Sequence, residues 1–444
     1  MVSRGDRMDI AMQRNISDEF DKWKTTGMKK PLMVLGARQV GKSFSIEIFG
    51  KKNFDYFHKF DLTKNKEIAN IFEKTINPEQ IIAEIELRIN KKIDVENTLL
   101  FFDEVQVSEK FIESLKYFNE SEKPYKIICA GSLLGLKINR FNSSFPVGKV
   151  KIIKMFPMSF EEFLQACGYG ILLEKIRDCY TNNKKMDNDL HEKLLRLYRY
   201  YLCIGGMPEN VIYFLENNQD ILLVDNDILE GIALSYLADM TKYTYNKNES
   251  VKIEKTYLSI PLQLAKENTK FMYKVIDEKA NKKGYESALD WLKASSMIIE
   301  CNKVNHIEIP LEVYKDTNAF KIYLSDLGLL TYLSKIDYTD IVLDRSFTYK
   351  GALVENYVAC EFTNKKNPLY YWQSNGMAEI DYLIYRRDDG IIPIEVKASD
   401  NNKSKSLNAY MDKYKPTYAI RVSSKNFGFE NNIKSVPLYA VFCI

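Results

Sequence analysis

The sequence predicts an α/β protein of several domains, in which a doubly wound parallel sheet comes first and a second α/β domain comes last. Short apolar runs alternate with helical periodicity up to about residue 155, and the same alternation returns near Lys350 and continues from there. Such alternation is typical of parallel sheets that are covered by helices. The length of 444 residues also exceeds what one hydrophobic core usually supports, so two to four domains are expected.

Four regions follow from this pattern. Residues 1–155 are the first α/β core, and residues 156–250 are a mostly helical subdomain. Residues 251–340 have the element order of a winged helix, and residues 341–444 are the second α/β domain.

Composition argues against several classes of protein. The 63 Lys and Arg residues against 60 Asp and Glu residues leave a net charge of +3, so nucleic-acid binding would need a local patch. The seven cysteines are single and only three His are present, which argues against a structural zinc site and fits a reducing compartment. The first thirty residues are charged, and no apolar stretch approaches the ~18 residues of a membrane span. A cytoplasmic protein without a membrane segment is expected.

The elements of the first region can be placed in order. Residues 8–26 have Ile16, Phe20 and Trp23 at helical spacing, and Gly27 ends this predicted helix. Apolar runs then predict the strands of the parallel sheet, at residues 32–35, 54–62, 98–102, 126–130 and 149–154.

A glycine-rich octapeptide follows the first of these strands. Residues 36–43 have the sequence G-A-R-Q-V-G-K-S and lead into a predicted helix at 44–49, which is the context that a phosphate-binding loop requires. The glycines let N–H groups turn toward phosphate, Lys42 brings a charge to the β- and γ-phosphates, and the Ser43 hydroxyl suits Mg²⁺. The sequence therefore predicts an ATP site. Its expected nucleotide-binding residues are Gly36, Ala37, Arg38, Gln39, Val40, Gly41, Lys42, Ser43 and Phe44.

A second motif supplies carboxylates. The apolar run at 99–102 ends in Asp103, which is expected to hold Mg²⁺ directly or through water, and Glu104, which is expected to polarise the attacking water. Alone, such a run is often just a strand end, and the phosphate loop is what makes it significant. Ser132 ends a further strand and is placed to sense the γ-phosphate or to orient the water. A plain strand-end turn explains Ser132 equally well.

Several longer segments carry a resemblance to a known family. They are N-T-L-L-F-F-D-E-V-Q (97–106), S-L-K-Y-F (114–118), A-G-S-L-L-G (130–135), S-F-P-V-G-K (144–149), P-M-S-F-E-E-F-L (157–164), G-G-M-P-E (205–209) and K-I-Y-L-S-D-L-G-L (321–329). Together they resemble the prokaryotic AAA-type ATPases that carry a C-terminal DUF4143 domain. The resemblance covers nearly the whole chain. It implies an AAA-type P-loop core, a winged helix, and self-assembly into a homo-oligomer with ATP hydrolysed between subunits.

The resemblance leaves the arginine finger of such an oligomer unassigned. Many members of the wider family have Gly-Arg where this chain has Gly148-Lys149, and lysine lacks the planar fork of arginine. Arg140 is the nearest candidate, and Arg38 lies in the phosphate loop itself.

The winged-helix segment is expected to hold three helices and then a β-ribbon. The two arms of the ribbon are predicted around a turn at residues 315–318, at Ile307–Tyr314 and Phe320–Leu324. The third helix, at about 285–296, would be the one that contacts DNA. Its exposed residues Glu286, Asp290 and Lys293 are two acids against one base, which favours a packing role. The two lysines just before it keep DNA binding open.

Four polar residues mark the last region. Glu355 lies in a predicted helix and Asp381 in a predicted strand. Glu395 and Lys397 lie in a further strand, where alternation places both on one face. This order and the D…E-x-K spacing resemble the PD-(D/E)xK nuclease fold, to which the DUF4143 resemblance also points.

The nuclease resemblance implies a site for Mg²⁺ or Mn²⁺. Asp381 and Glu395 match its metal ligands, and the Val396 carbonyl adds a further oxygen. Glu355 matches an acid that some members use on a second metal. Lys397 matches the residue that positions water or steadies the transition state. An E-x-K strand is nevertheless common, and this fold often survives as an inactive binding module.

Two functions therefore remain open. The first is an ATP-driven machine whose hydrolysis controls a metal-dependent nuclease, with DNA as its substrate by fold analogy alone. The second is an ATP-dependent switch or scaffold, in which an inactive nuclease-fold domain binds a protein or nucleic-acid partner.

Overall fold

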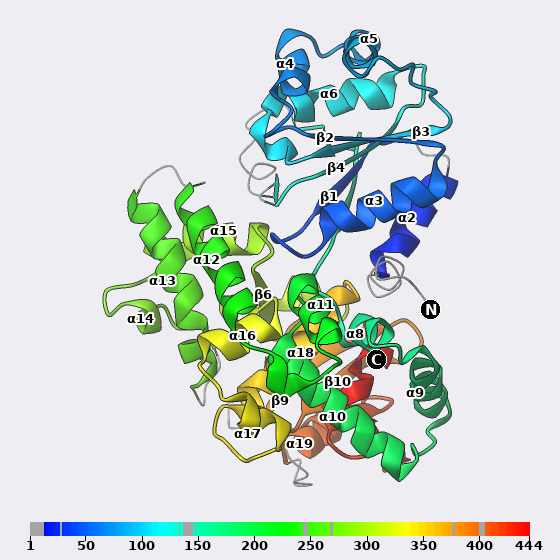
Figure 1. The fold of residues 1–444 in the computed structure, drawn as a ribbon. Helices are drawn as coiled ribbons and strands as arrows, with labels where there is room; N and C mark the ends of the chain where they lie inside the picture. Colours follow the sequence, from blue (N-terminus) through cyan, green and yellow to red (C-terminus); the bar gives the residue numbers. More distant parts are fainter. Residues whose placement is uncertain are drawn as a thin grey trace. The chain divides into compact units, whose positions relative to one another are not determined.

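The computed structural model describes residues 13–26, 29–132, 134–135, 145–146, 148–242, 247–266, 270–374, 378–398 and 405–444. The chain divides into two compact units (Figure 1). Unit 1 consists of Met1–Phe156 and Ala294–Ser296, and unit 2 consists of Pro157–Lys293 and Met297–Ile444.

Unit 1 contains a five-stranded sheet in which every neighbouring pair of strands is parallel. The strand order is β2-β3-β4-β1-β5. The strands are β1 (Leu32–Leu35), β2 (Tyr56–Asp61), β3 (Thr98–Asp103), β4 (Lys126–Ala130) and β5 (Lys151–Lys154). β1 and β3 are buried along their whole length, which explains their mostly apolar sequences. The strands predicted for this sheet are thereby confirmed.

The strand order decides where the polar segments of unit 1 meet. β4 lies between β1 and β3 and pairs with both. Because the carboxyl ends of parallel strands lie at one edge of a sheet, the segments that follow β1, β3 and β4 come together there. The phosphate loop, Glu104 and Ser132 belong to these three segments.

Helices cover both faces of this sheet. In Figure 1, α4, α5 and α6 lie over one face, and α2 and α3 lie on the other, which confirms the doubly wound class. The first face carries an aromatic cluster, in which the rings of Phe72 and Phe102 each lie 4.9 Å from the ring of Phe111. The helices described in unit 1 are α2 (Ile16–Thr25), α3 (Lys42–Asn53), α4 (Lys66–Lys74), α5 (Pro78–Ile89) and α6 (Glu109–Glu120).

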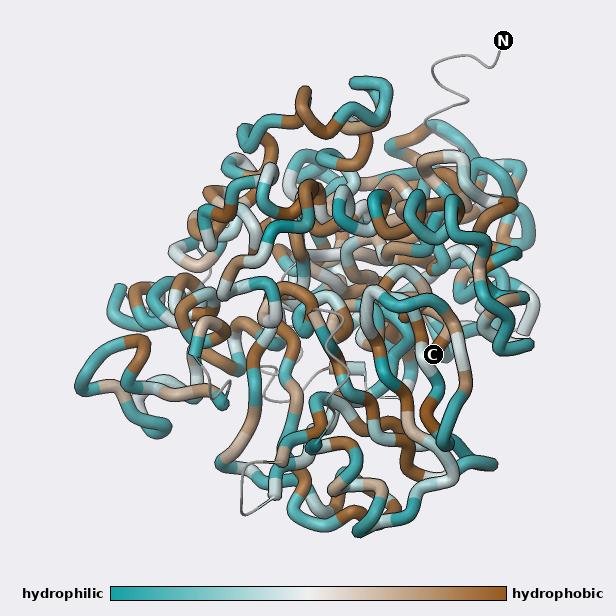
Figure 2. The backbone as a smooth tube through the Cα atoms, turned by 90° about the horizontal axis from the view of Figure 1, so that it is seen from below, coloured by the Kyte–Doolittle hydropathy of each residue, from teal (hydrophilic) through white to brown (hydrophobic). Residues whose placement is uncertain are grey.

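The predicted first helix is confirmed where the structure describes it. α2 buries Ile16, Phe20 and Trp23, the residues whose spacing predicted it, while residues 8–12 of the prediction lie outside the described residues. The backbone coloured by hydropathy in Figure 2 alternates between brown and teal over short distances, as expected for elements that each bury one face.

The amino-terminal part of unit 2 is helical. Its helices are α8 (Phe160–Ala166), α9 (Gly170–Asn182), α10 (Asn188–Ile204), α11 (Pro208–Glu216), α12 (Asp227–Lys242), α13 (Lys247–Leu264), α14 (Tyr273–Ile276) and α15 (Lys282–Ala294). Later helices are α16 (Leu327–Leu333), α17 (Tyr338–Val342), α18 (Lys350–Asn364) and α19 (Lys405–Tyr414). No helix in the described ranges is both long and apolar enough to cross a membrane.

An eight-stranded mixed sheet organises the rest of unit 2. Its strand order is β12-β13-β11-β10-β9-β8-β6-β7. The strands are β6 (Ile298–Val304), β7 (Lys315–Leu324), β8 (Tyr370–Gln373), β9 (Glu379–Arg386), β10 (Gly390–Val396), β11 (Ala419–Ser423), β12 (Gly428–Glu430) and β13 (Ile433–Pro437). The expected second α/β domain is therefore present.

The prediction for the first arm of the β-ribbon is wrong. It was expected at Ile307–Tyr314, whereas the ribbon is formed by β6 and β7, and Leu311–Tyr314 is a short 3₁₀ helix. Pro310 precedes that helix and has no N–H to donate to a strand ladder. The ribbon also continues into the larger sheet, because β6 pairs in parallel with β8. One sheet thus spans the predicted boundary at residue 340.

Two of the segments that carry the family resemblance meet inside unit 2. Gly205 has a φ of 74°, and a Cβ added there would lie 2.4 Å from the Gly328 nitrogen. The Gly206 N–H donates to Asp326 Oδ2 at 2.7 Å. Asp326 also caps α16 by accepting the Leu329 N–H at 2.9 Å. Close backbone contact explains the glycines of both segments.

The segment at 157–164 begins α8 with a reciprocal cap. The Ser159 side chain accepts the Glu162 N–H, and the Glu162 carboxylate accepts the Ser159 N–H. The Phe160 N–H donates to Glu361 Oε1 of α18 at 2.8 Å. Glu361 is buried, and this burial raises its pKa to about 8. A protonated carboxyl group thus ties α18 to the start of α8 at neutral pH.

Replacing Glu361 by Gln should remove a pH dependence of stability. A folded-state pKa raised from 4.5 to about 8 contributes stability that is full below pH 4.5 and is lost as the pH rises to about 8. Gln keeps the oxygen that accepts the Phe160 N–H but does not titrate. The melting temperature of Glu361→Gln minus that of the wild type should increase by at least about 2 °C between pH 5 and pH 9. Such a change corresponds to roughly 1 kcal/mol of stability. Parallel melting curves of the two proteins would contradict this.

Candidate functional site

The loop between β1 and α3 has the backbone of a phosphate cradle. Gly41 has a φ of 95° and begins α3, and Gln39 also has a positive φ, of 64°. Gly36 has a φ of 150°, and a Cβ there would lie 2.2 Å from the Met155 carbonyl oxygen. Both glycines of the motif are therefore required by geometry, and the loop ends at a helix N-terminus, which favours anions.

Lys42 is folded inside this loop. It is 8% exposed, and its Nζ donates to the carbonyl oxygens of Gly36 at 2.9 Å and Ala37 at 2.7 Å. These contacts hold the ammonium group within the loop whose N–H groups are expected to receive phosphate. The role of Lys42 as a charge partner of ATP stays a prediction.

Ser43 and Asp103 meet across the sheet edge. The Ser43 hydroxyl donates to Asp103 Oδ2 at 2.6 Å, and Lys59 Nζ lies 3.6 Å from the same oxygen. A hydroxyl and a carboxylate in contact form the oxygen donor set that Mg²⁺ prefers beside nucleotide phosphates. The residues present therefore fit a magnesium ion, which would neutralise phosphate charge when bound.

Glu104 is held by a residue that the sequence motifs missed. Its φ of 54° turns it away from the line of β3, and its N–H donates to Asp103 Oδ1 at 3.0 Å. Gln106 Nε2 donates to Glu104 Oε2. A Cβ at Gly131 would lie 2.3 Å from Gln106 Oε1, so the glutamine amide packs between Glu104 and the end of β4. Its position two residues after Glu104 was the available signal.

A second missed residue is Arg14. This arginine is buried, and its Nη1 donates to the Val40 carbonyl at 2.8 Å. Its Nη2 donates to the Phe156 carbonyl at 2.7 Å. Arg14 thus fixes the backbone of the phosphate loop. No local sequence pattern around Arg14 predicts these contacts, because they join it to segments that are distant in sequence.

The remaining residues expected around ATP have mixed outcomes. Ser132 is buried after β4, between the strands of the phosphate loop and of Glu104, and its role stays a prediction. Lys149 pairs with Glu120 at 2.9 Å. Arg38 is exposed in the loop. Arg140 lies outside the described residues, so no arginine finger is assigned.

In unit 2 the structure brings together three of the residues expected at the C-terminal metal site. Asp381 Oδ2 accepts the Val396 N–H at 2.7 Å. Burial and then the nearby Glu355 carboxylate raise the pKa of Asp381 to about 8. Glu355 also accepts a hydrogen bond from the Tyr323 hydroxyl at 3.2 Å. Two acids from α18 and β9 are therefore close enough to repel.

Glu395 has different partners. This carboxylate is 2% exposed, with Lys397 Nζ at 3.1 Å and Arg421 Nε at 3.7 Å. Its neighbour Ile394 pairs with Tyr382, whose hydroxyl donates to the Glu355 carbonyl at 2.8 Å. Since neighbouring residues of a strand point to opposite faces, Glu395 points away from the face on which Glu355 lies.

Sequence reasoning missed Lys321, which lies in the acidic cluster. Its Nζ is 2.5 Å from Glu379 Oε1 and 3.5 Å from Glu355 Oε2. Burial alone would lower the pKa of Lys321, but Glu355, Glu379 and Asp381 raise it above its usual value. Within the described ranges, no three His, Cys, Asp or Glu side chains are grouped to hold a metal ion. As arranged, the residues do not fit a divalent ion, and the C-terminal metal ligands stay a prediction.

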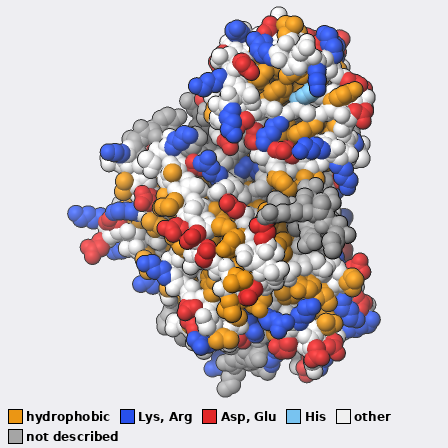
Figure 3. Space-filling view, in the orientation of Figure 1, with side chains coloured by type: hydrophobic (Ala, Val, Ile, Leu, Met, Phe, Trp, Pro, Cys, Tyr) orange, Lys and Arg blue, Asp and Glu red, His pale blue; other side chains and the backbone are white. Residues whose placement is uncertain are grey.

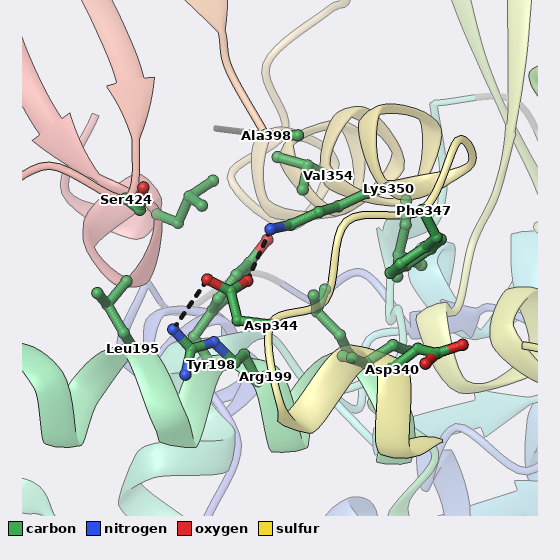
Figure 4. A pocket seen from close by; sticks show the side chains of 14 residues that line it. Leu195, Tyr198, Arg199, Asp340, Asp344, Phe347, Lys350, Val354, Ala398 and Ser424 are labelled. Carbon is green, nitrogen blue, oxygen red and sulfur yellow. Dashed lines mark hydrogen bonds and ion pairs between the residues drawn. The ribbon is translucent and has the colours of Figure 1, made fainter. Parts of the chain in front are cut away.

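A small cavity elsewhere in unit 2 holds an ion-pair network (Figure 4). Figure 4 shows Asp344 between Arg199 of α10 and Lys350 of α18, at 3.3 Å and 2.7 Å respectively. The cavity volume is ≈ 30 Å³, which leaves room for about one water molecule. It is too small for a nucleotide, so we assign this network to the packing of α10 against α18.

The five-stranded parallel sheet and the loop geometry of unit 1 are those of a P-loop ATPase fold. Residues 28–164 match a family described as an AAA domain. Residues 350–441 match a domain of unknown function, DUF4143, and residues 195–340 match another, DUF8612. The chain therefore carries an AAA domain and a DUF4143 domain.

Similar proteins span most of the chain. The uncharacterized protein MJ1544 of Methanocaldococcus jannaschii is 23% identical over 394 residues, which are 85% of this chain and 77% of that protein. A Walker-type ATPase of Pyrococcus abyssi is 15% identical, with a TM-score of 0.45, over 75% of this chain and 97% of the other. The ORC2 protein of Aeropyrum pernix is 10% identical, with a TM-score of 0.37, over 77% and 94%.

Proposed function

We propose that this chain is an ATP-hydrolysing switch whose C-terminal nuclease-like domain binds a partner. The observation that carries the proposal is the contact between the Ser43 hydroxyl and Asp103 beside Glu104. It joins a magnesium-binding pair to a carboxylate that can act as a base on water. The proposal includes Mg²⁺ with ATP and, by resemblance, a homo-oligomer.

Each residue of the proposed ATP site has its own role in hydrolysis. Lys42 and the loop N–H groups bind the phosphates and offset their charge. Glu104 accepts a proton from water while Gln106 holds its carboxylate in place. Ser132 orients the water or senses the γ-phosphate.

The output of the switch is proposed as binding rather than cutting. Its support is that Glu355 and Asp381 share their cluster with Lys321, while Glu395 pairs with Lys397 and Arg421. Where Figure 3 draws unit 2, basic and acidic side chains are interspersed, so a protein partner fits this surface better than a polyanion.

A metal-dependent nuclease that acts on DNA is the second candidate. It is favoured by the closeness of Glu355, Asp381 and the Val396 backbone, three positions that the nuclease resemblance implies. For that function Glu395 would have to reach the face on which Asp381 lies before the two carboxylates and the Val396 carbonyl could hold Mg²⁺ or Mn²⁺, and Lys397 would then assist cleavage.

Assays of both activities on the full chain separate the two functions. We expect Mg²⁺-dependent ATP hydrolysis that Asp103→Asn removes and that Asp178→Asn, a change at a partly exposed acid of α9, leaves unchanged. We expect no cleavage of plasmid, linear or single-stranded DNA with Mg²⁺ or Mn²⁺. Cleavage that disappears in Asp381→Ala but persists in Asp103→Asn would establish the second candidate instead. The absence of ATP hydrolysis would contradict the switch.

A further inference from the structure

The acidic cluster of unit 2 is built around one buried lysine. Lys321 is 1% exposed and lies on β7 among strand residues that are buried. Its Nζ contacts the carboxylates of Glu379 and Glu355, and it lies 5.0 Å from the centre of the Tyr371 ring. A lysine is almost never buried to this degree unless its charge is paired.

The acids around Lys321 already have protein donors. Asp381 accepts a hydrogen bond from the Val396 N–H, and Glu355 accepts one from the Tyr323 hydroxyl. Glu379 accepts one from the Lys321 ammonium group. A metal ion would compete with these donors for the carboxylate oxygens, because carboxylates are its preferred ligands. The donors therefore occupy positions at which a metal would coordinate.

We propose that the Lys321 ammonium takes the place of a divalent metal ion in this cluster. It supplies the positive charge that lets Glu355 and Glu379 lie beside Asp381 without a bound cation. Removing the ammonium should leave three carboxyl groups with no counter-charge, and a divalent ion then becomes the species that resolves their repulsion. The inference does not depend on ATP hydrolysis in unit 1, and it favours a C-terminal domain that binds without cutting.

Manganese binding to the full chain tests this inference. The experiment uses nucleotide-free protein carrying Asp103→Ala, so that the ATP site contributes no metal binding, and follows Mn²⁺ by calorimetry and by its electron paramagnetic resonance signal. Protein with Lys321 should show no Mn²⁺ binding up to about 1 mM, the weak end of protein cation sites. Lys321→Met should bind one Mn²⁺ at least tenfold more tightly, and adding Asp381→Asn should abolish that gain.

Two controls keep the test decisive. Lys315→Met changes an exposed lysine on the same strand and should leave Mn²⁺ binding at the level of the parent. Lys321→Gln removes the charge but keeps two N–H donors, so it serves if Lys321→Met does not fold. Mn²⁺ should also raise the melting temperature of the Lys321 variants and not that of the parent.

Two outcomes would overturn the inference. One is Mn²⁺ binding by the parent that Asp381→Asn removes, and the other is folded Lys321 variants that bind no Mn²⁺.

Discussion

Glu104→Gln is expected to bind ATP normally and to hydrolyse it roughly a hundredfold or more slowly, the range for the loss of a general base. The variant keeps an amide oxygen that can accept the hydrogen bond from Gln106 Nε2, so the local packing is preserved. It loses only the carboxylate that takes a proton from water. Single-turnover hydrolysis and equilibrium binding of ATP, measured on the same preparation, separate the two effects.

A matched change distinguishes this role from a general loss of charge. Glu113→Gln makes the same replacement in α6, where the carboxylate lies 2.9 Å from Lys110 and is partly exposed. It should hydrolyse ATP at the wild-type rate. Undiminished turnover in Glu104→Gln would remove Glu104 from the catalytic role.

Lys42→Ala is expected to weaken ATP binding by about a hundredfold or more, since each 1.4 kcal/mol is tenfold and a charged hydrogen-bond partner is lost in a buried site. The Lys42 ammonium donates to two carbonyl oxygens of the loop itself, those of Gly36 and Ala37. Binding of a fluorescent ATP analogue, with competition by ATP, measures the loss.

The control for Lys42→Ala lies on the same helix. Lys51 is in the last turn of α3, is 69% exposed and lies 3.9 Å from Glu47. Lys51→Ala should bind ATP as the wild type does. Melting curves without nucleotide should show that Lys42→Ala is folded. Wild-type affinity in a folded Lys42→Ala protein would contradict the predicted phosphate loop.

Much of unit 1 could be predicted from the sequence because its signals are local. Each strand of the parallel sheet is a short apolar run, and the loop residues Gly36, Lys42 and Ser43 have fixed spacing along the chain. Arg14 and Gln106 could not be predicted in the same way. Their contacts depend on segments distant in sequence or on the packing of a neighbouring strand.

In unit 2, irregular strand geometry limited how much of the candidate site could be predicted from the sequence. The register between β8 and β9 pairs Trp372 with Ile380 and Tyr370 with Leu383, so two residues of β9 lie opposite one residue of β8. Such a bulge interrupts the alternation of side chains along β9, so Asp381 does not lie on the face of Glu395 as the nuclease resemblance implies. Lys321 was overlooked because a lysine in a strand usually marks the solvent face, whereas here it crosses toward acids on β9 and α18.

The union of β6 with β8 has a consequence for how such proteins evolve. A domain that is exchanged between genes must carry every strand whose removal would expose an unpaired sheet edge. The DUF4143 match begins at residue 350, yet β8 inside that match is hydrogen-bonded to β6, which ends at Val304. A recombination event at residue 340 would leave β8 as a bare edge open to aggregation. We therefore expect the ribbon at 298–324 and the C-terminal sheet to be inherited together, as one module encoded by two separate stretches of the gene.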